Sequence, residues 1–242
     1  MIEKDILWLV VARSGSKSIL DKNVKLLGGI PLLAYRVKSA VQSSYTNDVW
    51  ISTDSESYAK IANQYGAQVP FIRPPELSTD QASSIDVVLH AVNFAEIQNK
   101  KYKFIGLLEP TSPFISTEIL DGAVAQLLSN TDASAIVATK ESRPNKVFVQ
   151  KQATFLTELS NNLKEIKKLG RQNFEKEITP AGGFYISRWN DFLEFKTFYN
   201  YNTLSYEVDD IAGLEIDEPI DWFFAEFIFE KQIFNKNNLF ES

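Results

Sequence analysis

Runs rich in apolar residues, without regular alternation, recur along this chain. The first covers residues 6–11, Ile-Leu-Trp-Leu-Val-Val. Others follow at residues 48–53, 69–72, 103–108, 135–138 and 182–187. A continuous apolar run is typical of a strand that is buried on both faces, as in a parallel sheet. The pattern therefore predicts a sheet whose strands are mostly parallel.

Apolar residues at helical spacing occupy the segments between these strands. Helices are predicted to begin at Pro31, at a cap formed by Asp54 or Ser55, at Ser83, shortly before residue 119, and at Pro219. Strands that alternate with helices predict an α/β fold with a doubly wound sheet. Residues 151–178 lack a strong apolar face, so we expect them to be an excursion from one domain that spans residues 1–242.

The loop after the first strand has the composition of an anion-binding turn. Residues 12–17 read Ala-Arg-Ser-Gly-Ser-Lys, and Lys22 follows closely. Open α/β sheets bind ligands at the carboxyl ends of their strands. Backbone N–H groups of such a turn can face an anion, and Arg13, Lys17 and Lys22 add three positive charges. We interpret the loop as a triphosphate-binding site.

The charge distribution favours a small anionic ligand. The chain has a net charge of −6, but its first 38 residues contain seven Lys or Arg against three Asp or Glu, an excess of four positive charges. The remaining residues therefore carry a net charge of −10. A cationic pocket in an acidic protein suits a small polyanion, and the overall charge argues against a nucleic-acid partner.

The absence of cysteine excludes disulfides and thiolate metal sites. The first five residues are mostly charged, and the apolar run that follows them is too short for a signal or membrane helix. We therefore expect a cytoplasmic protein that has no membrane partner.

Short motifs are distributed from the first strand to the last helix. They are Ala12-Arg13-x-Gly15-Ser16-Lys17, Lys22-Asn23, Ser52-Thr53-Asp54, Arg73-Pro74, Asp80-x-Ala82-Ser83-Ser84-Ile85-Asp86, Pro110-Thr111-Ser112-Pro113, Arg171-Gln172 and Ile216-Asp217-Glu218. Their order and spacing resemble those of the acylneuraminate cytidylyltransferases, the CMP-sialic acid synthetases. The resemblance implies a Rossmann-like nucleotidyltransferase fold and a homodimer formed through the excursion at residues 151–178. It also implies transfer of CMP from CTP to a nine-carbon 2-keto sugar acid, with release of pyrophosphate.

The resemblance further assigns roles to individual residues. In-line attack on the α-phosphorus depends on positioning and charge stabilisation. By this resemblance, the catalytic residues of the protein would be Arg13, Lys17, Lys22 and Asp217. The nucleotide would contact Ala12, Arg13, Ser14, Gly15, Lys22, Asn23, Arg73 and Ser84, with Asn23 and Ser84 on the ribose and Arg73 on the cytosine. The sugar would contact Glu109, Thr111, Ser112, Arg171 and Gln172.

Magnesium is the implied cofactor, because Mg²⁺ commonly takes one or two carboxylates and completes its shell with phosphate oxygens and water. Asp217 matches a metal aspartate of the family. Glu215 stands where the family has a second aspartate, and its longer side chain would bind the metal directly or through water. Val11 and Ala181 also depart from the family, which has proline and asparagine there.

Glu109 replaces the glutamine that contacts the sugar in the family. An ionised carboxylate cannot donate a hydrogen bond and would repel the carboxylate of a sugar acid. Our hypothesis is a preference for a differently substituted nonulosonic acid, such as a legionaminic-type or deaminated sugar.

Several residues also allow simpler interpretations. Gly15-Ser16-Lys17 is not a Walker P-loop, because the earlier glycine is absent. Lys22 and Lys25 would be solvated loop charges, and Arg73 would only fix its proline-rich loop. Asp217 would cap the last helix, although Glu218 is the better candidate for that role. His90 would pack or pair with Asp86 on its helix, and the aromatic residues 222–227 would belong to the core or a dimer contact.

Three other functions stay open from the sequence alone. One is CMP transfer to another sugar acid, such as the eight-carbon Kdo. A second is the use of another nucleoside triphosphate, and a third is nucleotide binding without turnover.

Overall fold

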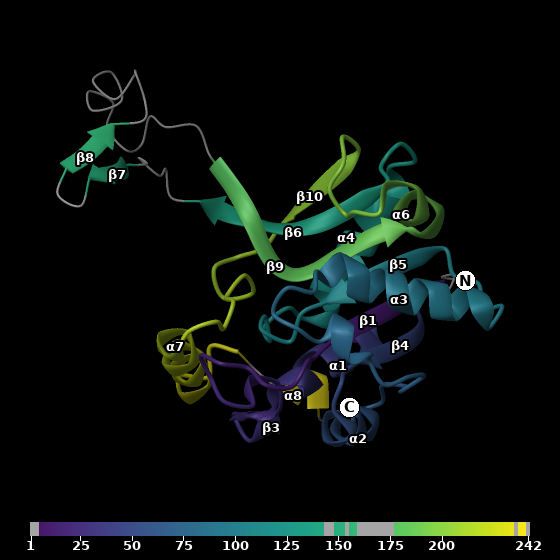
Figure 1. The fold of residues 1–242 in the computed structure, drawn as a ribbon, viewed down its shortest axis with the longest axis horizontal. Coiled ribbons are helices and arrows are strands. Elements are labelled where there is room, and N and C mark those ends of the chain that lie inside the picture. Colours follow the sequence, from purple (N-terminus) through teal and green to yellow (C-terminus); the bar gives the residue numbers. More distant parts are fainter. Residues whose placement is uncertain (1–4, 143–147, 153–154, 159–176, 235–236, 241–242) are drawn as a thin grey trace.

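The computed structural model describes residues 5–142, 148–152, 155–158, 177–234 and 237–240. Within these residues, six strands form one sheet in the order β10-β6-β9-β5-β1-β4 (Figure 1). Their bounds are β1 Ile6–Val11, β4 Thr46–Ser52, β5 Phe104–Leu108, β6 Ala135–Ser142, β9 Glu177–Arg188 and β10 Thr203–Glu207. β9 runs antiparallel to both β5 and β6, and the other paired strands are parallel. The prediction of a mostly parallel sheet is confirmed.

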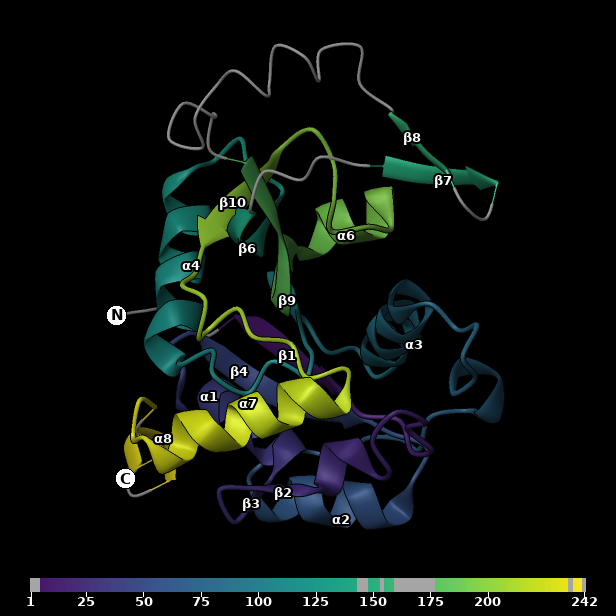
Figure 2. The same ribbon diagram turned by 90° about the vertical axis from the view of Figure 1, so that its left-hand side faces the viewer.

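Helices cover both faces of the sheet, with α4 on one side and α3 and α6 on the other (Figure 2). The helices are α1 Leu32–Gln42, α2 Glu56–Gln64, α3 Ser84–Ile97, α4 Thr117–Ser129, α6 Trp189–Phe195, α7 Pro219–Glu230 and α8 Asn237–Phe240. Shorter elements are η1 Lys22–Val24, β2 Leu26–Leu27, β3 Ile30–Pro31, η2 Pro75–Leu77, β7 Phe148–Gln152 and β8 Phe155–Glu158. This arrangement confirms the doubly wound α/β fold.

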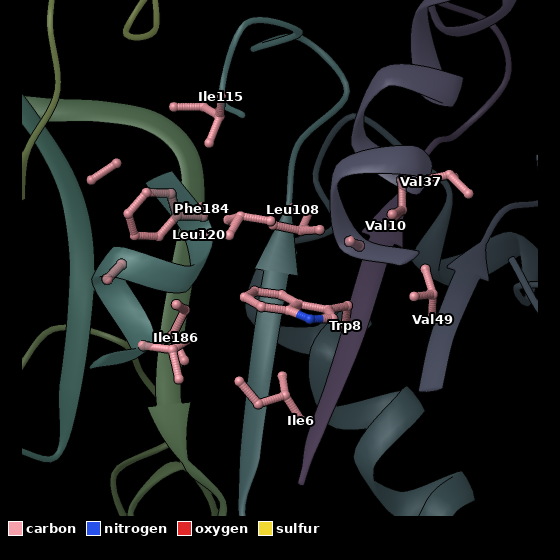
Figure 3. Packing of buried hydrophobic residues seen from close by; sticks show 14 of the residues in the cluster. Ile6, Trp8, Val10, Val37, Val49, Leu108, Ile115, Leu120, Phe184 and Ile186 are labelled. Carbon is pink, nitrogen blue, oxygen red and sulfur yellow. The ribbon is translucent and has the colours of Figure 1, made fainter. Parts of the chain in front are cut away.

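Alternate residues of β1 belong to two different hydrophobic clusters, one on each face of the sheet. Ile6, Trp8 and Val10 pack in one cluster with residues of α1 and α4 (Figure 3). Leu7 and Leu9 pack in another with residues of α3 and α6. Since side chains alternate between the faces of a strand, this division explains why the run is apolar at every position.

Residues 69–72 do not form the predicted strand. Gln68 makes an isolated bridge with Trp50, and the chain then continues as a loop to Arg73, whose N–H donates to the Thr53 carbonyl at 2.8 Å. Pro70 has no N–H to donate to a strand ladder, which explains why pairing ends there. The prediction was wrong because four apolar residues in a row do not distinguish a buried strand from a partly exposed loop, and Ile72 is 45% exposed here.

The predicted helix starts are confirmed in detail. Ser55, rather than Asp54, caps α2 by accepting the N–H of Tyr58 at 3.4 Å. Ser83 caps α3. Glu218 caps α7 in a reciprocal capping box with Asp221. Neither Asp54 nor Asp217 is therefore the N-cap of its neighbouring helix.

The excursion is inserted into an antiparallel pair of strands. The last residue of β6 pairs with the first residue of β9, Ser142 with Glu177. β7 and β8 lie between them and pair with each other in a separate sheet. The excursion thus spans residues 143–176, and residues 177–178 of the predicted segment belong to β9. Residues 153–154 and 159–176 lie outside the described part of the chain.

The aromatic residues of α7 do not share one environment. Trp222 is buried in a cluster with residues of β2 and α1, whereas Phe223, Phe224 and Phe227 are exposed. The core interpretation is correct for Trp222 alone. In the part of the chain that the structure describes, no helix is long and apolar enough to span a bilayer.

Candidate active site

The loop after β1 is fixed to neighbouring elements by backbone and side-chain bonds. Ala12 donates its N–H to the Ser52 carbonyl of β4 at 3.0 Å, and the Asn23 amide donates to the Arg13 carbonyl at 3.0 Å. Gly15 has a φ of 71°, which glycine adopts without a steric cost. The N–H and the hydroxyl of Ser14 both donate to the Asp54 carboxylate, each at 2.7 Å. The Ser14 N–H is therefore occupied by Asp54, in contrast to the expectation that it faces an anionic ligand.

The three cations of the loop are all paired with acids in this structure. Asp80, just before α3, accepts Arg13 at 2.6 Å and also pairs with Lys17. Lys22 donates its Nζ to the Ile216 carbonyl at 2.7 Å and to Asp217 Oδ1 at 3.1 Å. The Lys22 side chain is only 11% exposed, so it is not a solvated charge.

Lys25 differs from Lys22 in its surroundings. Its Nζ lies over the ring of Trp222, 4.1 Å from the centroid. An exposed cation–π contact of this kind contributes to packing. Lys25 is therefore a surface residue, as expected, but with an aromatic partner.

The segment before α7 is brought to the loop by contacts over long sequence distances. Ser18 donates its hydroxyl to the Asp217 carbonyl at 2.5 Å. Ile216 donates its N–H to the Thr111 carbonyl at 2.8 Å. Asp217 is thus held between the loop and the segment after β5, with a carboxylate that is 66% exposed.

Two adjacent cavities lie at the carboxyl ends of β1 and β5. The larger has a volume of about 350 Å³ and is lined by Val11, Arg13, Ser16, Lys17, Ser18, Lys22, Asn23, Glu109, Pro110 and Thr111. The smaller has a volume of about 230 Å³ and is lined by Val11, Arg13, Arg73, Leu77, Thr79, Asp80, Ala82, Ser84 and Val87. Val11 and Arg13 line both cavities, so the two cavities adjoin each other at these residues.

Arg73 both fixes its loop and lines the smaller cavity. Its Nε donates to the Ser52 hydroxyl at 3.0 Å, and its Nη2 donates to the Ser52 carbonyl. Burial lowers the pKa of Arg73 to about 10, so it stays charged at neutral pH. His90 packs edge-on against Phe71, with ring centroids 4.5 Å apart, which supports the packing role for this residue.

Glu109 lies at the end of the larger cavity that is formed by the segment after β5. Burial raises its pKa to about 7, and the charges of Glu215 and Asp217 add to this effect. A hydrogen bond with Tyr185 of β9 acts in the opposite direction. At neutral pH the Glu109 carboxyl group is therefore partly protonated, and in its protonated form it can also donate a hydrogen bond.

Glu215 extends towards β9. A Cβ atom at Gly182 would lie 2.7 Å from Glu215 Cδ, and Gly182 has a φ of 58°, so only glycine suits this position. Burial raises the pKa of Glu215, while the charge of Lys140 opposes the shift. The extra methylene of glutamate thus brings this carboxyl group against the backbone of β9.

The donor set can hold a magnesium ion at Asp217. The carboxylate of Asp217 is exposed, and Glu215 and Asp217 are near enough to Glu109 to raise its pKa. Mg²⁺ needs only one or two carboxylates beside phosphate oxygens and water. The described residues contain no cluster of three or more metal-ligating side chains.

The structure brings most of the predicted site residues together. Arg13, Lys17, Lys22, Asn23, Glu109 and Thr111 line the larger cavity, and Arg73 and Ser84 line the smaller one. Ala12 and Ser112 are buried beneath them, and the Ser112 hydroxyl has no hydrogen-bond partner among the described residues. Arg171 and Gln172 lie outside the described residues.

Sequence reasoning missed two side chains of the site. Asp80 belongs to one of the sequence motifs, but nothing in the sequence predicts its pairing with Arg13 and Lys17. Tyr185 gave no signal, because it lies within the continuous apolar run at residues 182–187. Both act through contacts that join distant parts of the chain.

An α/β sheet with cationic cavities at the carboxyl ends of its strands defines a nucleotide-binding protein of the Rossmann-like class. Residues 7–186 match the sequence profile of the cytidylyltransferases, and the chain belongs to this family. The family that its motifs indicate is thereby confirmed.

Several relatives are named for sialic-acid-like sugars. The N-acylneuraminate cytidylyltransferase of Escherichia coli is 32% identical over 98% of this chain and 55% of its own length. The CMP-N,N'-diacetyllegionaminic acid synthase of Legionella pneumophila is 32% identical over 93% of this chain and 96% of its own. The pseudaminic acid cytidylyltransferase of Campylobacter jejuni is 29% identical with the same coverage. The chain spans about half the length of the first relative and nearly all of the other two.

A solved structure shares the fold. The CMP:2-keto-3-deoxy-manno-octonic acid synthetase complexed with CTP aligns with a TM-score of 0.68 at 13% identity, over 94% of this chain and 99% of that one. At this identity the likeness supports the Rossmann-like nucleotidyltransferase architecture.

Proposed function

We propose that this protein transfers CMP from CTP to the anomeric hydroxyl of a sialic-acid-like nonulosonic acid and releases pyrophosphate. The observation that carries the proposal is the larger cavity, which is lined by three cations, Arg13, Lys17 and Lys22, and by Glu109 and Thr111. A triphosphate fits the cationic side and a polyhydroxylated acid fits the other. Membership of the cytidylyltransferases and the names of the relatives support the same assignment.

The reaction forms a bond between the anomeric oxygen and the α-phosphorus. The bond from that phosphorus to the bridging oxygen breaks, and pyrophosphate leaves with the electron pair, while the hydroxyl proton passes to a base or to water. Arg13 and Lys22 neutralise the charge that develops on the phosphates. Loss of one such contact costs about 3–4 kcal/mol at the transition state.

Asp217 is the residue that would hold Mg²⁺, with Glu215 as a further ligand directly or through water. The bound ion would neutralise phosphate charge during transfer. Lys22 contacts Asp217, so the side chain that binds phosphate also fixes the carboxylate that would bind the metal. Ser18 and Thr111 fix the backbone on either side of that carboxylate.

Glu109 is the residue that we connect with the choice of sugar. Its protonated form can donate a hydrogen bond as the family glutamine does, and its ionised form can only accept. A Glu109→Gln variant assayed on a panel of nonulosonic acids is expected to shift preference towards N-acetylneuraminate. An unchanged ranking would remove Glu109 from the determinants of specificity.

The decisive experiment is mass spectrometry of the products from CTP, Mg²⁺ and a panel of 2-keto sugar acids that includes Kdo. The expected product is the CMP conjugate of a nonulosonic acid, such as a legionaminic-type sugar, formed together with pyrophosphate. Parallel reactions with ATP, GTP and UTP test the choice of nucleotide. CTP binding without sugar-dependent pyrophosphate release would instead show a non-catalytic relative.

We also propose a homodimer formed through residues 143–176. The support is the position of this segment, which leaves the sheet between two paired strands, together with the dimer-forming excursion that the family resemblance implies. The cytoplasmic location expected from the sequence stays a prediction.

A further inference from the structure

Two side chains at the corner between β4 and α2 hold both ends of the first loop. Asp54 accepts the N–H and the hydroxyl of Ser14, each at 2.7 Å. Tyr58, in the first turn of α2, donates its hydroxyl to Asp21 Oδ1 at 3.0 Å. Ser14 directly follows Arg13, and Asp21 directly precedes Lys22. Each bond therefore fixes the chain neighbour of a cation that lines the larger cavity.

The backbone of the loop needs such support. Asp21 has a φ of 49°, in the left-handed region that costs free energy for a residue with a side chain. A conformation of this kind persists where the surrounding structure holds it, often beside a functional residue. Burial raises the pKa of Asp54, but its hydrogen bonds with Ser14 outweigh burial and hold the pKa below its usual value. Asp54 is therefore an ionised acceptor at neutral pH.

We propose that Asp54 and Tyr58 are positioning residues for the nucleotide: they fix the loop so that Arg13 and Lys22 face the phosphates. Among the described residues, neither side chain lines either cavity, so both act through the loop rather than on the ligand. The identity of the ligand rests on the proposed function. The positioning role follows from the contacts of Ser14 and Asp21.

Conservative variants can separate positioning from general stability. Asp54→Asn keeps the shape of the side chain but loses its charge and one acceptor, and Tyr58→Phe loses only the hydroxyl. Asp121→Asn is the matched control for the first, because Asp121 also accepts a backbone N–H, from Ser44 at 3.1 and 3.2 Å. Tyr65→Phe is the control for the second, at the far end of the same helix.

The readouts are calorimetric affinities for CTP and for inorganic pyrophosphate, the KM for CTP and for the sugar acid, and the thermal midpoint. Asp54→Asn and Tyr58→Phe are each expected to weaken both affinities at least fivefold and to raise the KM for CTP. The KM for the sugar acid should change less than twofold, and the two controls should bind CTP as the wild type does. Ser14→Ala combined with Asp54→Asn should lose less affinity than the sum of the two single losses, because the Ser14 hydroxyl and the Asp54 carboxylate share one hydrogen bond.

CTP affinity within twofold of the wild type in both folded variants would overturn the inference. Simple additivity of Ser14→Ala and Asp54→Asn would overturn it for Asp54. If Asp54→Asn does not fold, Ser14→Ala and Tyr58→Phe decide the matter alone. A wild-type protein that binds neither CTP nor pyrophosphate would overturn the proposed function instead.

Discussion

The charged residues of the site are defined by partners that lie far away in the sequence. Lys22 contacts Asp217, and both Arg13 and Lys17 contact Asp80. Burial and the negative charges of Glu215 and Asp217 raise the pKa of Glu109. The residue types could be recognised in the sequence, but the protonation and the ion pairs of these side chains depend on contacts with distant residues.

Replacement of Glu109 by glutamine is expected to change the pH dependence of stability. The pKa of Glu109 rises from 4.5 in the unfolded chain to about 7 in the fold. The contribution of Glu109 to stability is therefore fully present below pH 4.5 and is lost as pH rises to about 7, by up to about 3 kcal/mol. Since glutamine does not titrate, Glu109→Gln should gain stability relative to the wild type between pH 5 and 8. Denaturant unfolding across this range measures the difference, and a constant difference would contradict the raised pKa.

Replacement of Asp217 by asparagine is expected to lower kcat/KM for CTP at least a hundredfold, or about 3 kcal/mol. The Mg²⁺ concentration for half-maximal rate should rise, because asparagine is a neutral and weaker ligand. Steady-state rates across a Mg²⁺ titration measure both effects. Asp210→Asn, at an exposed acid of the preceding turn, is the control and should leave both unchanged. Wild-type Mg²⁺ dependence in Asp217→Asn would remove this residue from the metal site.

Among the elements, the segment that connects η2 to α3 contacts the loop after β1 through ion pairs of Asp80. Its Asp80 neutralises Arg13 and Lys17, whose side chains are 36% and 79% exposed. Exposed ion pairs of this kind are weak and are screened by salt. A triphosphate can therefore displace Asp80 at a small cost.

Replacement of Asp80 by asparagine should consequently lower the KM for CTP severalfold at low ionic strength. The gain should shrink at 0.5 M salt, where screening weakens the competing ion pairs. Glu76→Gln, at an exposed acid of η2, is the matched control and should change the KM by less than twofold. An unchanged or higher KM in Asp80→Asn would mean that Asp80 serves the bound nucleotide rather than competing with it.

At the scale of the whole molecule, the excursion is inserted in the chain between two neighbouring strands of the sheet, β6 and β9. Ser142 and Glu177 pair directly, so a two-residue Asn-Gly turn can join them in the geometry of a hairpin. The sheet and its helices then keep their own contacts.

A variant with Asn-Gly in place of residues 143–176 is expected to fold with a similar thermal midpoint but to be a monomer. Light scattering should give twice the chain mass of 27.4 kDa for the wild type and a single chain mass for a variant shortened in this way. A folded variant that is still a dimer would place the dimer contact elsewhere. Turnover should be lost, because Arg171 and Gln172 are removed.

The sequence by itself determined the class of the fold and the family. Continuous apolar runs such as residues 6–11 specify strands buried on both faces, and Ser83 and Glu218 mark helix starts, because these signals depend only on near neighbours. The tertiary structure alone decided that β9 lies antiparallel between β5 and β6 and that Asp54 supports Ser14. It also decided the raised pKa of Glu109. Each of these features depends on contacts between residues far apart in the chain, which local periodicity does not encode.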